Sequence, residues 1–154
     1  MKHLEELNHL IQEYVAFART LKRESLVQKM FMDRRSNDSE HPAHMAFYEA
    51  VGQWARDFAA SDPSQQELVP ALERLLLTAQ DYKDQMSYWY LLVVQGHAAC
   101  LIPLLEDSAR QHLLEIFEAQ YPCREQLPVQ KEIAGLLRGK TQEKKRKFLS
   151  SLFS

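Results

Sequence analysis

Hydrophobic residues recur three and four positions apart along most of the chain, and this spacing predicts helices. The first set predicts a helix over residues 4–21, which either continues to about Asp33 or bends after Ser25. The run 34–42 is rich in Ser, Asn and Asp and predicts a loop. The apolar face of the first helix consists of Leu4, Leu7, Ile11, Tyr14, Ala18 and Leu21.

Two more helices follow the predicted loop. Apolar spacing predicts a second helix over residues 47–58, which Ser61-Asp62-Pro63 ends. Ser64 and Glu67 have the spacing of a capping box, in which a hydroxyl accepts a hydrogen bond from the third helical N–H. We therefore expect the third helix to begin there and to extend to about Tyr82.

The last two predicted helices have clear sequence boundaries. Asp107 or Ser108 can cap a helix that ends near Tyr121, because Pro122 pushes the residue before it out of the α conformation. Pro128 is then placed to open a helix, and Gly139 is placed to stop it.

The longest apolar run covers residues 87–105, nineteen positions without Asp, Glu, Lys or Arg. That length is nominally enough to cross a bilayer. However, Gln95, Gly96 and His97 interrupt it, and polar groups at membrane depth are costly. We therefore expect a pair of helices with a bend at these residues, buried nearly all round as the central element of the core. The aromatic residues 88–90 are expected to be part of that core.

The predicted elements add up to an all-α protein of about six or seven helices, built as a compact bundle or as a short stack of helical hairpins. Two segments share an apolar-apolar-Pro-x-Leu pattern with prolines 33 positions apart, Leu68-Val69-Pro70-Ala71-Leu72 and Leu101-Ile102-Pro103-Leu104-Leu105. This spacing resembles one unit of a helical-repeat protein such as the HEAT class. Gly96-His97 followed by Leu104-Leu105 also resembles the second-helix opening of an ankyrin unit. The resemblance implies stacked hairpins, whereas the compact bundle is the favoured expectation.

Composition is that of an ordinary soluble protein: 154 residues, 45% hydrophobic, 26% charged and a net charge of -2. This length suits one domain, which we expect over residues 1–139, with a separate tail at 140–154. Four glycines and six prolines leave little material for β-hairpins. Cys100 and Cys123 are too few for a disulfide framework and are expected to be reduced and packed in apolar surroundings, and no secretory signal is visible. We therefore expect a cytoplasmic protein.

Catalytic motifs are absent from the sequence, so we expect no cofactor and favour a role other than that of an enzyme. There is no Gly-x-Ser-x-Gly motif, and the glycines at 135 and 139 are separated by three residues, not the four of a phosphate-binding loop. The alternative is a metal-binding helical bundle with an enzymatic or sensor role. Imidazoles on separate helices can converge on one ion, and His9, His44 and His97 are the candidate ligands.

The tail is the segment least explained by folding alone. Residues 138–147 contain six basic side chains and one acidic side chain, a net charge of +5, whereas the rest of the chain carries -7. Basic residues followed by apolar ones predict an amphipathic helix that binds another protein. The partner-binding candidates are Lys144, Lys145, Arg146, Lys147, Phe148, Leu149, Leu152 and Phe153.

This tail makes a protein-protein interaction module, an adaptor or regulatory domain, the predicted function. Packing of the tail on its own domain and contact with a membrane surface remain open alternatives. Integral membrane insertion is not expected. Nucleic-acid binding is not expected either, because a chain with a pI near 6.3 is a poor match for a phosphate backbone.

Overall fold

The structure, a computed structural model, describes residues 2–30 and 41–139, with side chains for 2–21 and 41–139. Within these ranges the chain forms six α-helices joined by 3₁₀ segments, and it forms no strand. The all-α prediction of six or seven helices is confirmed. In chain order the elements are α1 (Lys2–Met30), α2 (Pro42–Ala60), α3 (Gln65–Leu77), η2 (Thr78–Tyr82), α4 (Tyr88–Val93), η3 (Val94–Cys100), η4 (Ile102–Leu104), α5 (Asp107–Gln120), η5 (Cys123–Glu125) and α6 (Pro128–Arg138).

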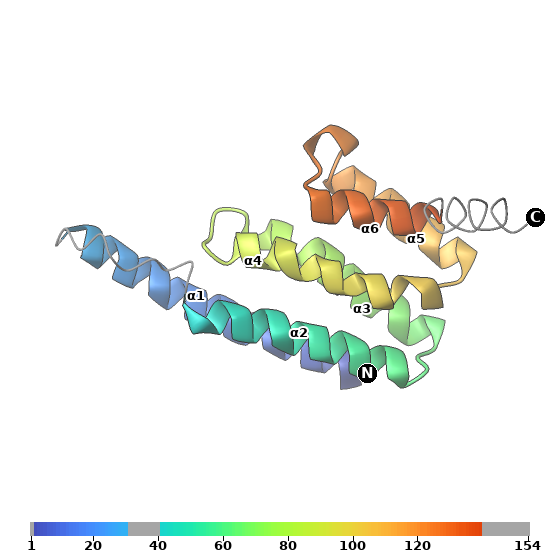
Figure 1. The fold of residues 1–154 in the computed structure, drawn as a ribbon, viewed down its shortest axis with the longest axis horizontal. Helices are drawn as coiled ribbons and strands as arrows, with labels where there is room; N and C mark the ends of the chain where they lie inside the picture. The colour runs from blue at the N-terminus through green and yellow to red at the C-terminus, as the bar shows by residue number, and fades with distance from the viewer. Residues whose placement is uncertain (1, 31–40, 140–154) are drawn as a thin grey trace, which may run out of the picture.

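The elements pack in pairs, and the pairs lie in three layers (Figure 1). The first layer pairs α1 with α2, the second pairs α3 with η3, and the third pairs α5 with α6. Along one side of the molecule α3 lies between α1 and α5, and along the other side η3 lies between α2 and α6. The middle layer is therefore covered on both faces.

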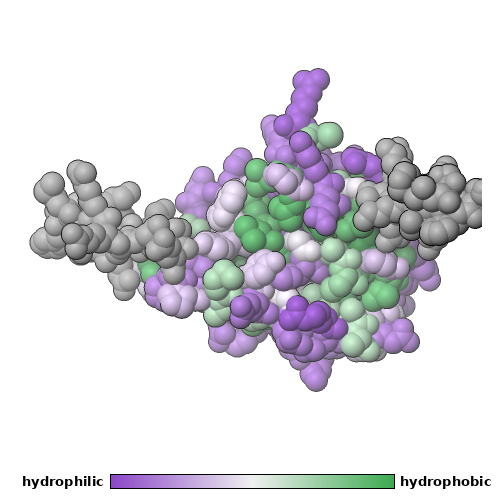
Figure 2. Space-filling model, viewed as in Figure 1, coloured by the Kyte–Doolittle hydropathy of each residue, from purple (hydrophilic) through white to green (hydrophobic). Residues whose placement is uncertain are grey.

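The three layers share one hydrophobic core. Leu7 and Ile11 of α1, Phe58 of α2 and Phe117 of α5 are almost completely buried in it. The Trp54 indole also belongs to this core, and its Nε1–H donates a 2.7 Å hydrogen bond to the backbone oxygen of His3. Figure 2 shows that most of the face in view is polar, with apolar side chains near its centre.

Local sequence signals set several helix boundaries. The Ser64 hydroxyl accepts a 3.3 Å hydrogen bond from the Glu67 N–H, so the predicted cap of α3 is confirmed. Gly139 follows α6 with a φ of 74°, a left-handed conformation that glycine adopts without strain, and it ends the helix as predicted. α1 continues as one helix to Met30, without a break after Ser25.

The predicted cap of α5 is wrong. The N-cap is Glu106, one residue earlier than Asp107 or Ser108, and its side chain makes no capping hydrogen bond. Instead, its backbone N–H donates to Oε1 of Gln65 at 3.0 Å. Gln65 is the first residue of α3, so a neighbouring helix holds the backbone where α5 begins, although it does not replace the capping hydrogen bond.

The apolar run is also more fragmented than expected. It forms the short helix α4 and then the 3₁₀ segments η3 and η4, and one face of it is buried while the other is not. Leu91 and Ala98 are fully buried, whereas Trp89 is 55% exposed and Leu104 is 40% exposed. The expectation of an element buried all round is therefore wrong, because only one side of this run faces the core.

The structure also bears on three other expectations. No helix among the described residues has both the length and the apolar character that a membrane span requires. Cys100 and Cys123 are free thiols at the surface, so the prediction that they pack in the interior is wrong. Pro70 lies inside α3 but Pro103 lies in η4, so the two similar segments do not occupy equivalent places in the fold.

A network of glutamines links the middle layer to the third layer. The amide of Gln95, which is fully buried, donates to the Leu76 carbonyl at 2.9 Å and to the Tyr121 hydroxyl at 3.2 Å. Leu76 is in the last turn of α3, where carbonyls have no partner within the helix. Gln130 of α6 donates to Oε1 of Gln95 at 3.5 Å and accepts from the Leu127 N–H at 3.0 Å. Burial raises the pKa of Tyr121, and the Gln95 hydrogen bond opposes that rise.

Candidate functional site

The predicted partner-binding residues, Lys144 to Phe153, lie outside the described residues. Their role as a contact surface for another protein therefore stays a prediction. The described part of the chain offers three other candidate features: the predicted histidine ligands, an exposed aromatic end of the molecule, and a polar cavity.

The structure places the three predicted metal ligands in three different settings. His9 is on the solvent face of α1, where its Nε2 lies 2.9 Å from Oε1 of Glu13. His44 is buried between α1, α2 and α4, and His97 packs between η3 and α2. Among the described residues, no group of three or more His, Cys, Asp or Glu side chains could hold a metal ion. The metal hypothesis therefore gains no support from this part of the chain.

His97 fits against a glycine. A Cβ added to Gly52 would lie 2.7 Å from Cε1 of the imidazole, so α2 has room for this ring only because residue 52 has no side chain. The Tyr48 ring packs beside it, with ring centroids 4.3 Å apart. Burial lowers the pKa of His97; a hydrogen bond with the Tyr48 backbone raises it, and the Arg56 charge lowers it. The surroundings thus favour a neutral imidazole.

His44 lies in an aromatic cluster at one end of the molecule. Its ring stacks on Tyr90 with centroids 4.1 Å apart and an interplanar angle of 2°. Its Nδ1 lies 2.7 Å from the Tyr14 hydroxyl. Burial, and to a smaller extent Tyr90, raises the pKa of Tyr14 well above its ordinary value, so the phenol stays protonated and can donate to Nδ1. These contacts connect α1, α2 and α4 through aromatic side chains.

Two large apolar side chains are exposed beside this cluster. Met45 directly follows His44 at the start of α2 and is 57% exposed, and Trp89 directly precedes Tyr90 at the start of α4 and is 55% exposed. The prediction that the aromatic residues 88–90 all belong to the core is therefore wrong for Trp89. Because His44 stacks on Tyr90, the helix starts that carry Met45 and Trp89 are joined by an aromatic contact.

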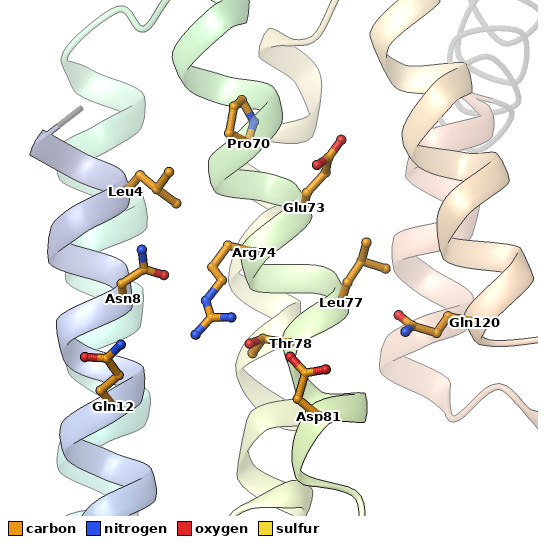
Figure 3. A pocket seen from close by; sticks show the side chains of 10 residues that line it. All are labelled: Leu4, Asn8, Gln12, Pro70, Glu73, Arg74, Leu77, Thr78, Asp81 and Gln120. Carbon is orange, nitrogen blue, oxygen red and sulfur yellow. The ribbon is translucent and has the colours of Figure 1, made fainter.

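A polar cavity of about 530 Å³ lies between α1 and α3 (Figure 3). Residues four positions apart on one face of α1 form one wall, and α3, η2 and the last residue of α5 form the rest. Arg74 extends from α3 toward α1, whereas the Glu73 carboxylate is turned toward α5, where Nε2 of His112 lies 3.3 Å from it. The lining residues are Leu4, Asn8, Gln12, Pro70, Glu73, Arg74, Leu77, Thr78, Asp81 and Gln120.

Three residues that line this cavity each have a buried polar atom without a hydrogen-bond partner among the described residues: Oδ1 of Asn8, Nε of Arg74 and Oγ1 of Thr78. Thr78 as a whole is only 3% exposed. Buried polar atoms are nearly always paired in folded proteins, because an unpaired one loses its hydration without replacement. Each of these three atoms has therefore lost its hydration, which costs free energy that no hydrogen bond among the described residues returns.

None of these three residues belongs to a site predicted from the sequence. Asn8 and Thr78 are seventy positions apart, and amides and hydroxyls on helices are usually solvated. One signal was present: Asn8 and Gln12 follow Leu4 at intervals of four, which puts polar groups beside the apolar stripe of α1. No family model matches the chain, and no curated protein or solved structure shows significant similarity to it.

Proposed function

We propose that this chain is a protein-protein interaction module that acts as an adaptor or regulatory helical domain. The observation that supports it best is that Met45 and Trp89 are both more than half exposed. They belong to the first turns of α2 and α4, and these two helices begin at the same end of the molecule (Figure 1). Tryptophan is among the residues that most often anchor protein interfaces, and methionine adapts its shape to a partner surface.

The aromatic cluster beneath this pair supports the same role. An anchor residue contributes most when binding does not first have to order it. The His44–Tyr90 stack and the Tyr14 hydrogen bond hold the starts of α2 and α4 together, so Trp89 projects from a fixed base. The proposed partner is another protein, and the tail residues 144–153 are proposed as a second contact. Two unpaired surface cysteines favour a cytoplasmic location for this interaction.

Quantitative affinity capture from a lysate of the source cell tests the proposal. The full-length chain is compared with Trp89→Ser and with a matched control, Leu104→Ser, which removes another exposed apolar side chain in η4. We expect one protein captured in stoichiometric amount by the full-length chain and the control, and lost with Trp89→Ser. Equal capture by all three would exclude Trp89 as the anchor.

A fourth bait that ends at Arg138 separates the two proposed contacts. Reduced capture of the same partner would assign part of the interface to the tail, and unchanged capture would remove the tail from the proposal. Elemental analysis of the full-length bait belongs in the same experiment. About one metal ion per chain with no protein partner would overturn the adaptor proposal in favour of a metal-binding bundle.

A further inference from the structure

The imidazole of His97 is held against the backbone of α2. A Cβ added to Gly52 would lie 2.7 Å from Cε1, 3.1 Å from Nδ1 and 3.2 Å from Nε2, so the ring occupies the space that a side chain would take there. The Tyr48 ring, one turn earlier in α2, packs beside the imidazole. His97 thus joins η3 to the middle of α2.

This arrangement suits only an uncharged ring. Nε2 of His97 is buried and has no hydrogen-bond partner among the described residues. A protonated imidazole carries an N–H at this nitrogen as well as at Nδ1. That N–H would have neither an acceptor nor water in the observed position, and a buried charged donor without a partner costs more free energy than a neutral one.

The groups around the ring do not offset this cost. Arg56 of α2 opposes a further positive charge, and the Tyr48 backbone hydrogen bond, which favours the charged ring, has a smaller effect than burial. In η3 the Cys100 thiol donates to the backbone oxygen of His97, not to its ring. From α6, Val129 lies against η3 and is not titratable. His97 belongs to no group of described residues that could hold a metal ion.

η3 is also held in place independently of His97. The buried amide of Gln95 donates to the Leu76 carbonyl of α3 and to the Tyr121 hydroxyl. The His97 side chain is only partly buried, so rotation about its own bonds can carry the ring into water while Gln95 stays in place. η3 is a 3₁₀ segment, whose hydrogen bonds have poorer geometry than those of an α-helix, so it can adjust without disturbing α2.

We propose that the contact between His97 and Gly52 is an acid-sensitive latch, closed when the imidazole is neutral and open when it is protonated. In the open state the ring lies in solvent, the surface of α2 at Gly52 is exposed, and Gln95 still holds η3 on α3. Histidine is the side chain whose ordinary charge change falls between about pH 5 and 8, where such a latch can work. The latch is independent of the protein-binding surface proposed above.

Proton NMR of the full-length chain between about pH 7.5 and 4.5 tests the proposal. The signal of the His97 ring is identified by its absence from the spectrum of His97→Gln. At the neutral end of the range we expect a nuclear Overhauser effect between the Hε1 proton of His97 and the α-protons of Gly52. The ring is expected to titrate below its ordinary pKa of 6.5, and the Overhauser effect is expected to be lost as it does so.

Two glycine substitutions locate the latch. Gly52→Ala adds the methyl group whose place the ring occupies, so we expect the latch to be open even at neutral pH and the titration midpoint of His97 to rise toward 6.5. Gly135→Ala is the matched control, the same change at a partly exposed position of α6, and it should leave the midpoint unchanged.

Circular dichroism shows whether each protein is folded at each pH, and the wild-type spectra alone decide the matter if Gly52→Ala does not fold. Persistence of the Overhauser effect after the ring is protonated would overturn the proposal. So would a ring that stays neutral down to about pH 4.5 or titrates at 6.5 or above. A folded Gly52→Ala protein with the wild-type midpoint, or unfolding of the whole chain as His97 titrates, would also exclude a local latch.

Discussion

Two groups of buried polar side chains in this protein have the same chemistry but differ in their hydrogen bonding. One group is fully paired, and the other is not. Gln95, Tyr121 and Gln130 are connected to one another and to the backbone of α3, so Gln95, the centre of this group, uses both its donor and its acceptor. Asn8 and Thr78 also carry an amide and a hydroxyl, yet each leaves a buried polar atom without a partner. A completed network stabilises one packing arrangement, whereas an unpaired buried polar atom costs desolvation free energy without return.

The position of each group in the layers explains the difference. Gln95 belongs to η3 in the middle layer, with α2 on one side and α6 on the other, so neighbours surround its amide. Asn8 belongs to α1 in the first layer, and the cavity lies between it and α3. Removal of a group from the glutamine network should therefore destabilise the fold, and removal of a group from the cavity should not.

The largest effect is expected for Gln95→Leu, a change of similar size that removes every hydrogen bond of the amide. The Leu76 carbonyl, the Tyr121 hydroxyl and the Gln130 amide would each lose a partner in the interior. We expect the free energy of unfolding to fall by about 3 kcal/mol, measured by urea denaturation. Gln12→Leu at the exposed edge of the cavity is the matched control, with an expected change within about 0.5 kcal/mol. Equal effects of the two substitutions would contradict the comparison.

Tyr14→Phe tests a second completed contact, in the aromatic cluster. It removes the buried 2.7 Å hydrogen bond to Nδ1 of His44 and keeps the ring that stacks on Phe47. We expect a loss of about 1 kcal/mol in unfolding free energy by thermal or urea denaturation. Tyr48→Phe is the control, because the Tyr48 hydroxyl has no hydrogen bond to the described residues, and it should change stability by less than about 0.5 kcal/mol. A Tyr14→Phe protein as stable as its parent would mean that this bond adds nothing.

Thr78→Val is expected to change the free energy of unfolding in the opposite direction to Gln95→Leu and Tyr14→Phe. The hydroxyl of Thr78 is buried without a partner, so its replacement by a methyl group removes a polar group that the fold does not satisfy. We expect stability to stay the same or to rise by up to about 1 kcal/mol, measured by urea denaturation. A loss of more than about 1 kcal/mol would show that the hydroxyl has a structural partner, and the cavity would then resemble the glutamine network.

The smallest expected effect is the pH dependence that His97 gives to the free energy of unfolding. Its Nε2 is a further buried atom without a hydrogen-bond partner among the described residues. The ordinary pKa of 6.5 applies to the unfolded chain, and burial lowers the pKa of His97 in the folded protein. Below pH 6.5 the unfolded chain therefore binds a proton that the folded chain does not, and the stability contributed by neutral His97 is lost as the pH falls toward the folded pKa.

The measurement is the unfolding free energy of the wild-type chain minus that of His97→Gln, at a series of pH values between about 7.5 and 5, across the unperturbed histidine pKa. The subtraction cancels the titration of the carboxylates, which both proteins share. We expect the difference to decrease as the pH falls. A difference that stays constant over this range would show that folding does not shift the pKa of His97.

Sequence reasoning located the helices because helix formation depends on neighbours three and four residues away. Leu7 and Ile11 lie in the core as their spacing indicates, Ser64 caps α3, and Gly139 stops α6. The same reasoning failed for Trp89, since an apolar run does not indicate which of its faces meets another layer. It also failed for the start of α5, where Gln65 supplies a hydrogen bond from forty-one positions away.

The sequence by itself determined the class of fold, the order of the helices and most of their boundaries, because hydrophobic periodicity, caps and helix-stopping residues act within one or two turns. Only the tertiary structure decided which polar groups are satisfied. Asn8, Arg74 and Thr78 are ordinary helical residues until α1 and α3 lie side by side, and His97 has room only because Gly52 faces it. Desolvation depends on what surrounds an atom in space, and residues far apart in the sequence supply those surroundings.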